Sequence, residues 1–230
     1  MNLRVGAIVQ ARMTSSRLPG KVIMRLHEDK TVLECLIGRL RKAETLDGII
    51  VACTNKVDDI PILKLCEKLE TEVHKGDEAD VLGRTYDAAW RAKLDIIVRI
   101  TSDCPLVDPA MIDEMVRAFK YGGCEYLSNG HKVRMVTKGF DIEVFHMLGL
   151  ADVHFSCNNN ELREDVTPYF YTFGGRLRAK SWSPNLPILE ANYSIDTIED
   201  LERVRAAYAK LVDTYGEKFT YGEFCYLEGK

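Results

Sequence analysis

The sequence predicts an α/β protein with a doubly wound, mostly parallel β-sheet. Short apolar segments rich in β-branched residues recur at 5–9, 48–53 and 96–100. They lack a regular polar–apolar alternation, which is typical of parallel strands covered on both faces. Segments with the spacing of an amphipathic helix lie between them. Because right-handed connections join consecutive parallel strands, we expect helices on both sides of the sheet.

Two amphipathic helices are predicted between these strands. The first presents an apolar stripe made of Val32, Cys35, Leu36, Leu40 and Ala43. The second presents a stripe made of Ile60, Leu63, Cys66 and Leu69. Together with the three strands, these stripes predict that residues 1–120 form one doubly wound unit.

The second half of the chain has a mixed pattern. Phe140, Ile142 and Val144 alternate with polar residues, which predicts a half-buried strand. A helix is predicted over 160–173 with an interruption at Pro168, and a further strand over 176–182. We expect this part to form a small antiparallel portion inserted into the main sheet.

The clearest helix of the second half follows Thr197. Its apolar face comprises Ile198, Leu201, Val204, Tyr208 and Leu211. Thr197 and Asp200 have the spacing of a capping box. The chain contains no internal repeat, low-complexity segment or Pro/Gly-rich linker, so we expect a single domain over residues 1–230.

Composition narrows the classes of function. The formal net charge is −4, which gives no reason to expect nucleic acid or an anionic membrane as a partner. Seven cysteines, none in a C-x-x-C pair, argue against a disulfide framework or a structural zinc site. The apolar segment at 5–9 is too short for a signal-peptide core or a membrane span. We therefore expect a cytoplasmic protein.

A basic loop over 11–21 follows the first strand. In open α/β sheets, ligands bind beyond the carboxyl ends of the strands. The loop carries the cations Arg12, Arg17 and Lys21, and Ser15, Ser16 and Gly20 add hydroxyl and backbone N–H groups. This chemistry suits a polyphosphate, although a solvated surface loop is the alternative. The sequence matches neither G-x-x-x-x-G-K-[ST] nor G-x-G-x-x-G, which excludes a P-loop and disfavours a dinucleotide site.

Four acidic residues are candidates for a second part of the site. Asp103 follows the third predicted strand and Asp196 precedes the helix after Thr197, so a helix cap is the alternative role for each. For Asp103 that role is the weaker one, because Asp108 before Pro109 is the better cap. Asp141 and Glu143 lie two residues apart on a predicted strand and point the same way, towards a cleft or towards solvent.

The loop and five further segments resemble the cytidylyltransferases, a group that includes the CMP-Kdo synthetases, the acylneuraminate cytidylyltransferases and the SpsF-like spore-coat polysaccharide proteins. The resemblance covers nearly the whole chain, and the matching segments are 8–21, 76–84, 98–109, 139–145, 163–169 and 194–201. It implies the nucleotide-diphospho-sugar transferase (GT-A-like) fold. It also implies transfer of CMP from CTP to a sugar or sugar acid, with release of pyrophosphate, for surface polysaccharide synthesis.

The resemblance implies a role for each candidate residue. Asp103 and Asp196 would hold Mg²⁺, and Arg12, Arg17 and Lys21 would act in catalysis on the phosphates. The expected nucleotide contacts are Ala11, Arg12, Ser15, Ser16, Arg17, Gly20, Lys21, Asp80 and Arg84. The expected acceptor contacts are Asp141, Glu143 and Arg163. An i, i+4 ion pair on a solvated helix is the alternative for Asp80 and Arg84.

Two positions depart from the expected pattern. Relatives often have histidine where this chain has Asp165, and we expect aspartate where it has Lys138. The departure at Asp165 concerns the identity of the acceptor. Relatives also suggest a homodimer, whereas the residues themselves indicate no oligomeric state.

Two other functions are alternatives. A glycosyltransferase that consumes a nucleotide sugar often carries a D-x-D metal motif, and this chain has Asp141-Ile142-Glu143 and no D-x-D. A non-catalytic nucleotide-binding module would not need Lys21, Asp103 and Asp196 together. The sequence therefore favours a Mg²⁺-dependent cytidylyltransferase.

Overall fold

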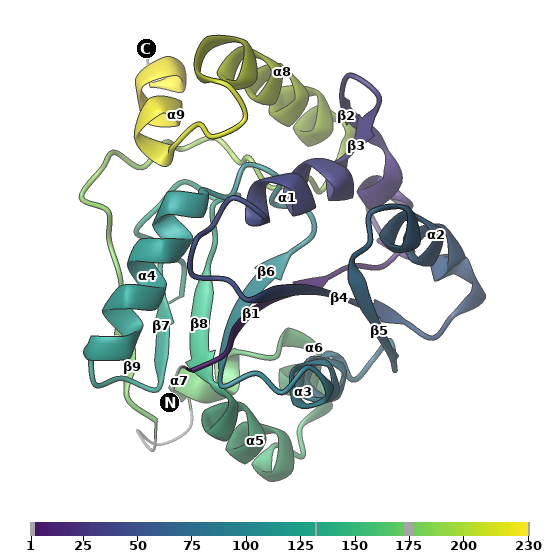
Figure 1. The fold of residues 1–230 in the computed structure, drawn as a ribbon, viewed down its shortest axis with the longest axis vertical. Coiled ribbons are helices and arrows are strands. Elements are labelled where there is room, and N and C mark those ends of the chain that lie inside the picture. Colours follow the sequence, from purple (N-terminus) through teal and green to yellow (C-terminus); the bar gives the residue numbers. More distant parts are fainter. Residues whose placement is uncertain (1–2, 132, 173–176, 230) are drawn as a thin grey trace.

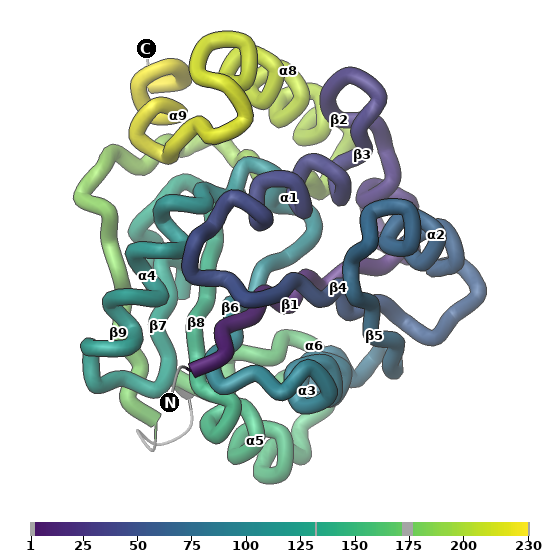
Figure 2. Tube along the Cα trace, viewed as in Figure 1, coloured from purple at the N-terminus to yellow at the C-terminus, as the bar shows by residue number. Residues whose placement is uncertain are grey.

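The computed structural model describes residues 3–131, 133–172 and 177–229. Within these ranges a seven-stranded sheet forms the centre of the molecule (Figure 1). Its strands lie side by side in the order β5 (Glu72–Gly76), β4 (Gly48–Thr54), β1 (Val5–Gln10), β6 (Ile96–Thr101), β8 (Glu143–His146), β7 (Tyr126–Ser128) and β9 (Ala179–Ser181). Although β1 begins the chain, it lies in the middle of the sheet between β4 and β6 (Figure 2).

The sheet is parallel on one side and mixed on the other. Strands β5, β4, β1 and β6 pair in parallel. Strand β8 is antiparallel to both β6 and β7, whereas β7 and β9 are parallel. The predicted doubly wound, mostly parallel sheet with a small antiparallel portion is therefore confirmed.

Helices cover both faces of the sheet because its central strands are apolar on both sides. Ala7 and Val9 point into one core, and Ile8 points into the other. The first core is closed by α1 (Val32–Leu40), α2 (Ile60–Lys68), α4 (Pro109–Tyr121), α8 (Ile198–Tyr215) and α9 (Tyr221–Glu228). The second is closed by α3 (Val81–Arg91), α5 (Met147–Ser156), α6 (Asn160–Asp165) and α7 (Pro168–Thr172). Figure 1 shows α1 and α4 opposite α3 and α5 across the sheet.

The predicted helices are confirmed, with two errors in their apolar stripes. Ile60 is 42% exposed and Ile198 is 50% exposed. Each is the first residue of its helix, where the side chain lies before the turn that packs into the core. The capping box is confirmed, because Thr197 accepts from the Asp200 amide and Asp200 accepts from the Thr197 amide.

The predicted strand around residue 142 is only partly correct. Phe140, Ile142 and Val144 are fully buried, but β8 begins only at Glu143. The Asn129 side chain replaces strand pairing before that point. It donates to the Phe140 carbonyl at 2.9 Å and accepts from the Ile142 amide at 2.8 Å.

The remaining predictions for the second half need smaller corrections. The helix over 160–173 is interrupted as predicted, with Val166 at φ 68° between α6 and α7, and residue 173 lies outside the described ranges. The strand predicted over 176–182 is shorter, and its first residue also lies outside those ranges. The short antiparallel hairpin β2 (Arg25–His27) and β3 (Lys30–Thr31) was not predicted.

Further sequence expectations concern cysteines and membrane spans. All seven cysteines are buried free thiols. Among the residues that the structure describes, no helix combines the length and apolar composition that a membrane span requires.

Candidate active site

A cavity of about 370 Å³ opens beyond the carboxyl ends of β1 and β6. Gln10 and Thr101, the last residues of these strands, are paired in register and line it together. The basic loop contributes much of the wall. The lining includes Ala11, Arg12, Ser15, Ser16, Arg17, Lys21, Arg84, Asp103 and Asp196. The parallel pairing of β1 and β6 thus places the loop beside Asp103.

Lys21 joins the loop to both aspartates. It is 8% exposed, and its Nζ lies 2.9 Å from Asp103 Oδ2 and 3.3 Å from Asp196 Oδ1. It also donates to the Ile195 carbonyl at 2.5 Å. A solvated surface loop is therefore the wrong description at Lys21, although the Arg17 side chain is 64% exposed.

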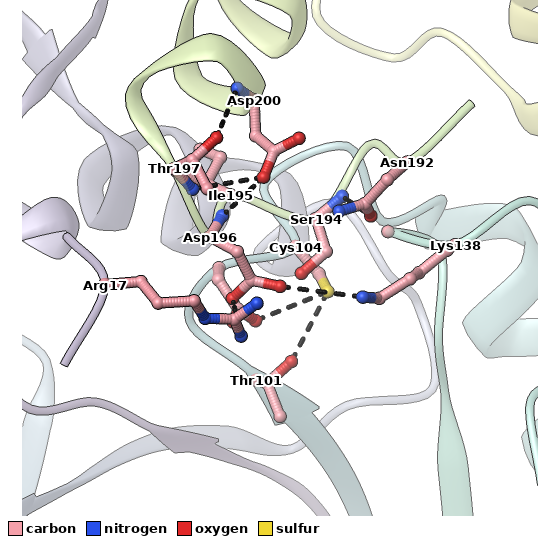
Figure 3. Close-up of polar contacts among 12 residues, drawn as sticks. Arg17, Thr101, Cys104, Lys138, Asn192, Ser194, Ile195, Asp196, Thr197 and Asp200 are labelled. Carbon is pink, nitrogen blue, oxygen red and sulfur yellow. Dashed lines mark hydrogen bonds and ion pairs between the residues drawn. The ribbon is translucent and has the colours of Figure 1, made fainter. Parts of the chain in front are cut away.

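Asp196 lies among three cations. Arg17 Nη2 is 2.9 Å from its Oδ1, and Lys138 Nζ is 3.5 Å from its Oδ2. Figure 3 shows its carboxylate between Arg17 and Lys138. Lys21 is the third cation.

The backbone around Asp196 is held on two sides. Its own amide donates to Asp200 Oδ2 at 3.2 Å, and the Ile195 amide donates to the Asp103 carbonyl at 2.9 Å. The cap of α8 is Thr197, so the alternative that Asp196 caps this helix is wrong. Asp108 caps α4 ahead of Pro109, as expected. The carboxylates of Asp103 and Asp196 are therefore left to face the cavity.

Asp103 carries charge in this environment. Burial opposes its ionisation, but the Lys21 ammonium and the hydrogen bonds from Lys21, Thr101 and Cys104 more than offset it, so its pKa lies below the ordinary value. Burial beside this carboxylate raises the pKa of the Cys104 thiol well above its usual range. Cys104 is therefore a neutral packing residue, and Asp103 is an anionic carboxylate.

The donor set fits magnesium. Mg²⁺ uses one or two carboxylates and completes its shell with water and substrate phosphate oxygens. Asp103 and Asp196 supply two carboxylates within reach of one ammonium nitrogen. Among the described residues, no group of three His, Cys, Asp or Glu side chains could hold a metal ion. A metal at Asp103 and Asp196 would therefore need oxygen ligands from a substrate or from water.

A second cavity of about 300 Å³ adjoins the first and shares Arg17, Thr101, Asp103 and Asp196 with it. Asp141 and Glu143 both line this cavity, so their cleft-facing alternative is the correct one. Further lining residues are Arg99, Cys104, Lys138 and Ser194. The two cavities thus meet at the aspartate pair.

Asp141 and Glu143 are held in place by basic and hydroxyl groups. Glu143 forms an ion pair with Arg99 and accepts from the Tyr126 hydroxyl at 2.5 Å. Arg99 also donates to Gln10 Oε1 at 2.7 Å, which connects the cavities. Asp141 accepts from Arg134 at 2.7 Å. The remaining carboxylate lone pairs are available to hydroxyl groups of a ligand.

Asp80 and Arg163 line neither cavity and pair with each other. Arg163 Nε and Nη2 lie 3.0 and 2.8 Å from the two carboxylate oxygens of Asp80. Asp80 also caps α3 through the Gly83 amide. The pair ties α6 to α3, and Glu164 and Asp165 of α6 line the first cavity.

Arg84 lies in the wall of the first cavity. It is 4% exposed and donates to the Asp77 carbonyl at 2.8 Å, so a solvated i, i+4 ion pair with Asp80 is the wrong description. Burial lowers its pKa. Gly20 is absent from the lining, and its φ of 73° serves the turn that positions Lys21.

Several lining residues were not among the predicted site residues. Gln10, Thr101 and Ser102 stand at or just beyond the ends of β1 and β6. The same rule that placed the loop at this edge could have identified them. Arg99 gave no such signal, because a charged residue inside an apolar strand does not reveal its partner.

Comparisons with known proteins identify the family of this chain. Residues 6–219 match the family model for cytidylyltransferases. The spore coat polysaccharide biosynthesis protein SpsF of Bacillus subtilis is 30% identical over 210 residues, which cover 88% of this chain and 85% of SpsF. The uncharacterized protein MJ1063 of Methanocaldococcus jannaschii is 38% identical over 169 residues, covering 74% of this chain and 68% of that protein.

Solved structures show the same fold. A cytidylyltransferase from Leptospira borgpetersenii superposes with a TM-score of 0.91 at 29% identity, covering 99% of this chain and 94% of that one. A CMP:2-keto-3-deoxy-manno-octonic acid synthetase complexed with CTP superposes with a TM-score of 0.69 at 15% identity, covering 90% and 99%. At that identity the second likeness concerns the fold alone. With the family model matching most of its length, the chain belongs to the cytidylyltransferase family.

Proposed function

We propose that this chain transfers CMP from CTP to a hydroxyl group of a sugar or sugar-acid acceptor and releases pyrophosphate. The observation that carries the proposal is the meeting of two cavities at Asp103 and Asp196. One cavity has the cations suited to a triphosphate, and the other has the carboxylates suited to sugar hydroxyls. The shared edge is where the α-phosphorus and the acceptor oxygen would have to meet.

The reaction is an in-line displacement at the α-phosphorus. A bond forms between the acceptor oxygen and the α-phosphorus, and the bond from that phosphorus to the bridging oxygen of the β-phosphate breaks. The acceptor hydroxyl loses its proton to solvent, and pyrophosphate carries away the developing negative charge. Arg12, Arg17 and Lys21 lie in the wall of the first cavity, where they would neutralise that charge.

Asp103 and Asp196 would hold Mg²⁺ in this reaction. When bound, the ion supplies positive charge at the phosphate oxygens and lowers the pKa of a nearby hydroxyl group. Ala11, Ser15, Ser16, Gly20 and Arg84 complete the nucleotide side, with Gly20 acting through its turn. Asp80 and Arg163 would act indirectly, by holding α3 and α6 at the mouth of the cavity.

The acceptor belongs to the second cavity. Asp141 and Glu143 would accept hydrogen bonds from its hydroxyl groups. The similarity to SpsF supports a role in the synthesis of a surface polysaccharide. The similarity to 3-deoxy-manno-octulosonate cytidylyltransferases, at 30% identity over half of this chain, supports a sugar acid as the acceptor class.

Pyrophosphate release tests this proposal. The chain is incubated with Mg²⁺, each of the four nucleoside triphosphates in turn, and a panel of sugar acids with their neutral sugar counterparts. We expect release that requires CTP and one class of acceptor. Release of a nucleoside phosphate from a nucleotide sugar, in place of pyrophosphate from CTP, would contradict the proposal. Pyrophosphate release that does not depend on any acceptor would contradict it as well.

A further inference from the structure

Lys21 is placed as an internal cation between the two aspartates. We propose that in the nucleotide-free chain its ammonium group occupies the position of the metal ion and suppresses metal binding until a polyphosphate draws Lys21 away. The inference rests on the proposed metal site at Asp103 and Asp196. It concerns the order of events there, namely that metal and nucleotide bind as a coupled pair.

The donors of Lys21 are fully used within this cluster. A lysine ammonium has about three N–H donors and no acceptor. Nζ is within hydrogen-bond distance of three acceptors, Asp103 Oδ2, Asp196 Oδ1 and the Ile195 carbonyl. In this arrangement no donor remains for a phosphate oxygen. Lys21 therefore serves either the aspartates or the nucleotide at one time.

An ammonium in this position opposes a metal ion directly. It takes up lone pairs on both carboxylates that the ion would use, and it repels a second cation at close range. The repulsion is weakly screened, because Lys21 and Asp196 are both buried. Arg17 and Lys138 contact the Asp196 carboxylate as well, but neither bridges it to Asp103.

The chain provides a route for Lys21 to leave the pair. Lys21 lines the first cavity, so a triphosphate there would offer it alternative acceptors. Its side chain is a flexible four-carbon stem, which allows the ammonium to move without the backbone. Once Lys21 faces the phosphates, the lone pairs that it occupied on both aspartates are available to the metal ion. Linkage requires the coupling to be reciprocal, so bound metal also favours the nucleotide.

Binding of Mn²⁺ alone tests the inference, with neither nucleotide nor acceptor present. Electron paramagnetic resonance measures free Mn²⁺ and gives the dissociation constant. We expect Lys21→Met to bind Mn²⁺ about tenfold or more tightly than the wild-type chain, within the usual range of site-to-site coupling. Adding Asp196→Asn to Lys21→Met should abolish this gain, which would place the ion at the aspartate pair.

Lys138→Met is the matched control. It also removes one positive charge beside Asp196, but Lys138 does not bridge the two aspartates. It should tighten Mn²⁺ binding by only about two- to threefold, through the loss of one partly screened charge. A gain in Lys21→Met no larger than that in Lys138→Met, or no gain at all, would overturn the inference. If Lys21→Met does not fold, Lys21→Gln keeps a polar side chain without the charge and carries the same expectation.

This result is separable from the proposed reaction. A gain of Mn²⁺ affinity in Lys21→Met would support the role of Lys21 even if the wild-type chain released no pyrophosphate from CTP. The absence of that release would refute only the proposed reaction. Pyrophosphate release by the wild-type chain, without a gain of Mn²⁺ affinity in Lys21→Met, would support the reaction and refute the proposed role of Lys21.

Discussion

At the residue scale, Asp196 connects the two parts of the candidate site. It accepts contacts from Arg17, Lys21 and Lys138, and its carboxylate stands where the two cavities meet. Replacing it by asparagine would keep the shape of the side chain and remove its charge, so contacts that depend on the charge would weaken together. The functional consequence and the stability consequence of this change are measurable separately.

We predict that Asp196→Asn lowers turnover by about 10²–10³-fold, the usual effect of removing one preorganised electrostatic contact. It should also cost roughly 1–3 kcal/mol of unfolding free energy, because a buried cation loses a charged partner. Steady-state pyrophosphate release and urea unfolding measure the two effects. Asp103→Asn should behave similarly.

The double variant tests whether the two aspartates act on one ion. Residues that act as a unit give non-additive losses. Asp103→Asn with Asp196→Asn should therefore be scarcely slower than either single variant. Losses that multiply would mean that the aspartates serve separate steps.

Gly139 positions Lys138 and the segment before Asp196. Its φ is 110°, and a Cβ atom there would overlap the carbonyl group of Tyr193. The Lys138 carbonyl accepts from the Tyr193 amide at 2.8 Å across this contact. Only glycine permits so close an approach of the two backbones.

We predict that Gly139→Ala destabilises the fold by more than about 3 kcal/mol, through backbone strain and the steric clash together. Gly123→Ala is the matched control, because Gly123 has φ 57° and no atom within 4 Å of the added Cβ. That change should cost only about 1–2 kcal/mol. Equal losses of unfolding free energy in the two variants, measured by urea unfolding, would show that the close contact with Tyr193 does not add to the destabilisation.

The sequence revealed some of these residues and hid others for a physical reason. Lys21 and Asp103 lie in loops beyond the carboxyl ends of strands, and all carboxyl ends of the strands of a parallel sheet reach the same edge. Lys138 and the Asp80–Arg163 pair depend on contacts between segments far apart in the chain. No periodicity or local motif encodes such a pairing, so the exact partners required the structure.

At the scale of elements, Glu217 links the start of the fold to its end. It follows α8 and accepts from Lys30 of β3 at 2.7 Å and from Lys42 after α1 at 2.8 Å. Hydrogen bonds from Lys30 and Lys42 lower its pKa to about 2. The hairpin and α1 are thereby joined to the C-terminal helices.

This pKa gives a pH-dependent prediction. The folded pKa is depressed below the ordinary 4.5, so the contribution of Glu217 to stability is present above 4.5 and is lost as the pH falls towards 2. Glu217→Gln should therefore be less stable than the wild-type chain at pH 6. The difference in unfolding free energy should shrink steadily as the pH is lowered through 4.5. If the difference in unfolding free energy is constant over this pH range, it arises from packing and not from the charge of Glu217.

Helices and strands were predicted correctly where their local sequence pattern was strong. The apolar runs at β1, β4 and β6 were unambiguous, and each strand proved one residue longer than predicted. The hairpin of β2 and β3 is too short to show a period. The segment before β8 alternates like a strand, yet the Phe140 carbonyl and the Ile142 amide pair with the Asn129 side chain. Alternation predicts which side chains are buried, not which group pairs with the backbone.

At the scale of the whole molecule, one large core runs from Val5 in β1 to Cys225 in α9. Arg39 strengthens this connection, since its guanidinium is fully buried and donates to the carbonyls of Val107, Glu217 and Phe219. This continuity supports our proposal that residues 1–230 form a single nucleotidyltransferase domain. It also explains how strands and helices from both halves of the chain can form one site.

Nucleotide-dependent stabilisation tests the central claim, that the cavity beyond β1 and β6 binds CTP with a metal ion. Thermal unfolding is followed with Mg²⁺ and equal concentrations of CTP, ATP, GTP or UTP. A ligand at about 100 times its dissociation constant stabilises the native state by about 2.7 kcal/mol. We predict the largest increase in melting temperature with CTP, and a smaller one when Asp196 is replaced by asparagine. Equal increases with all four nucleotides, or a larger increase with ATP, GTP or UTP than with CTP, would contradict the account.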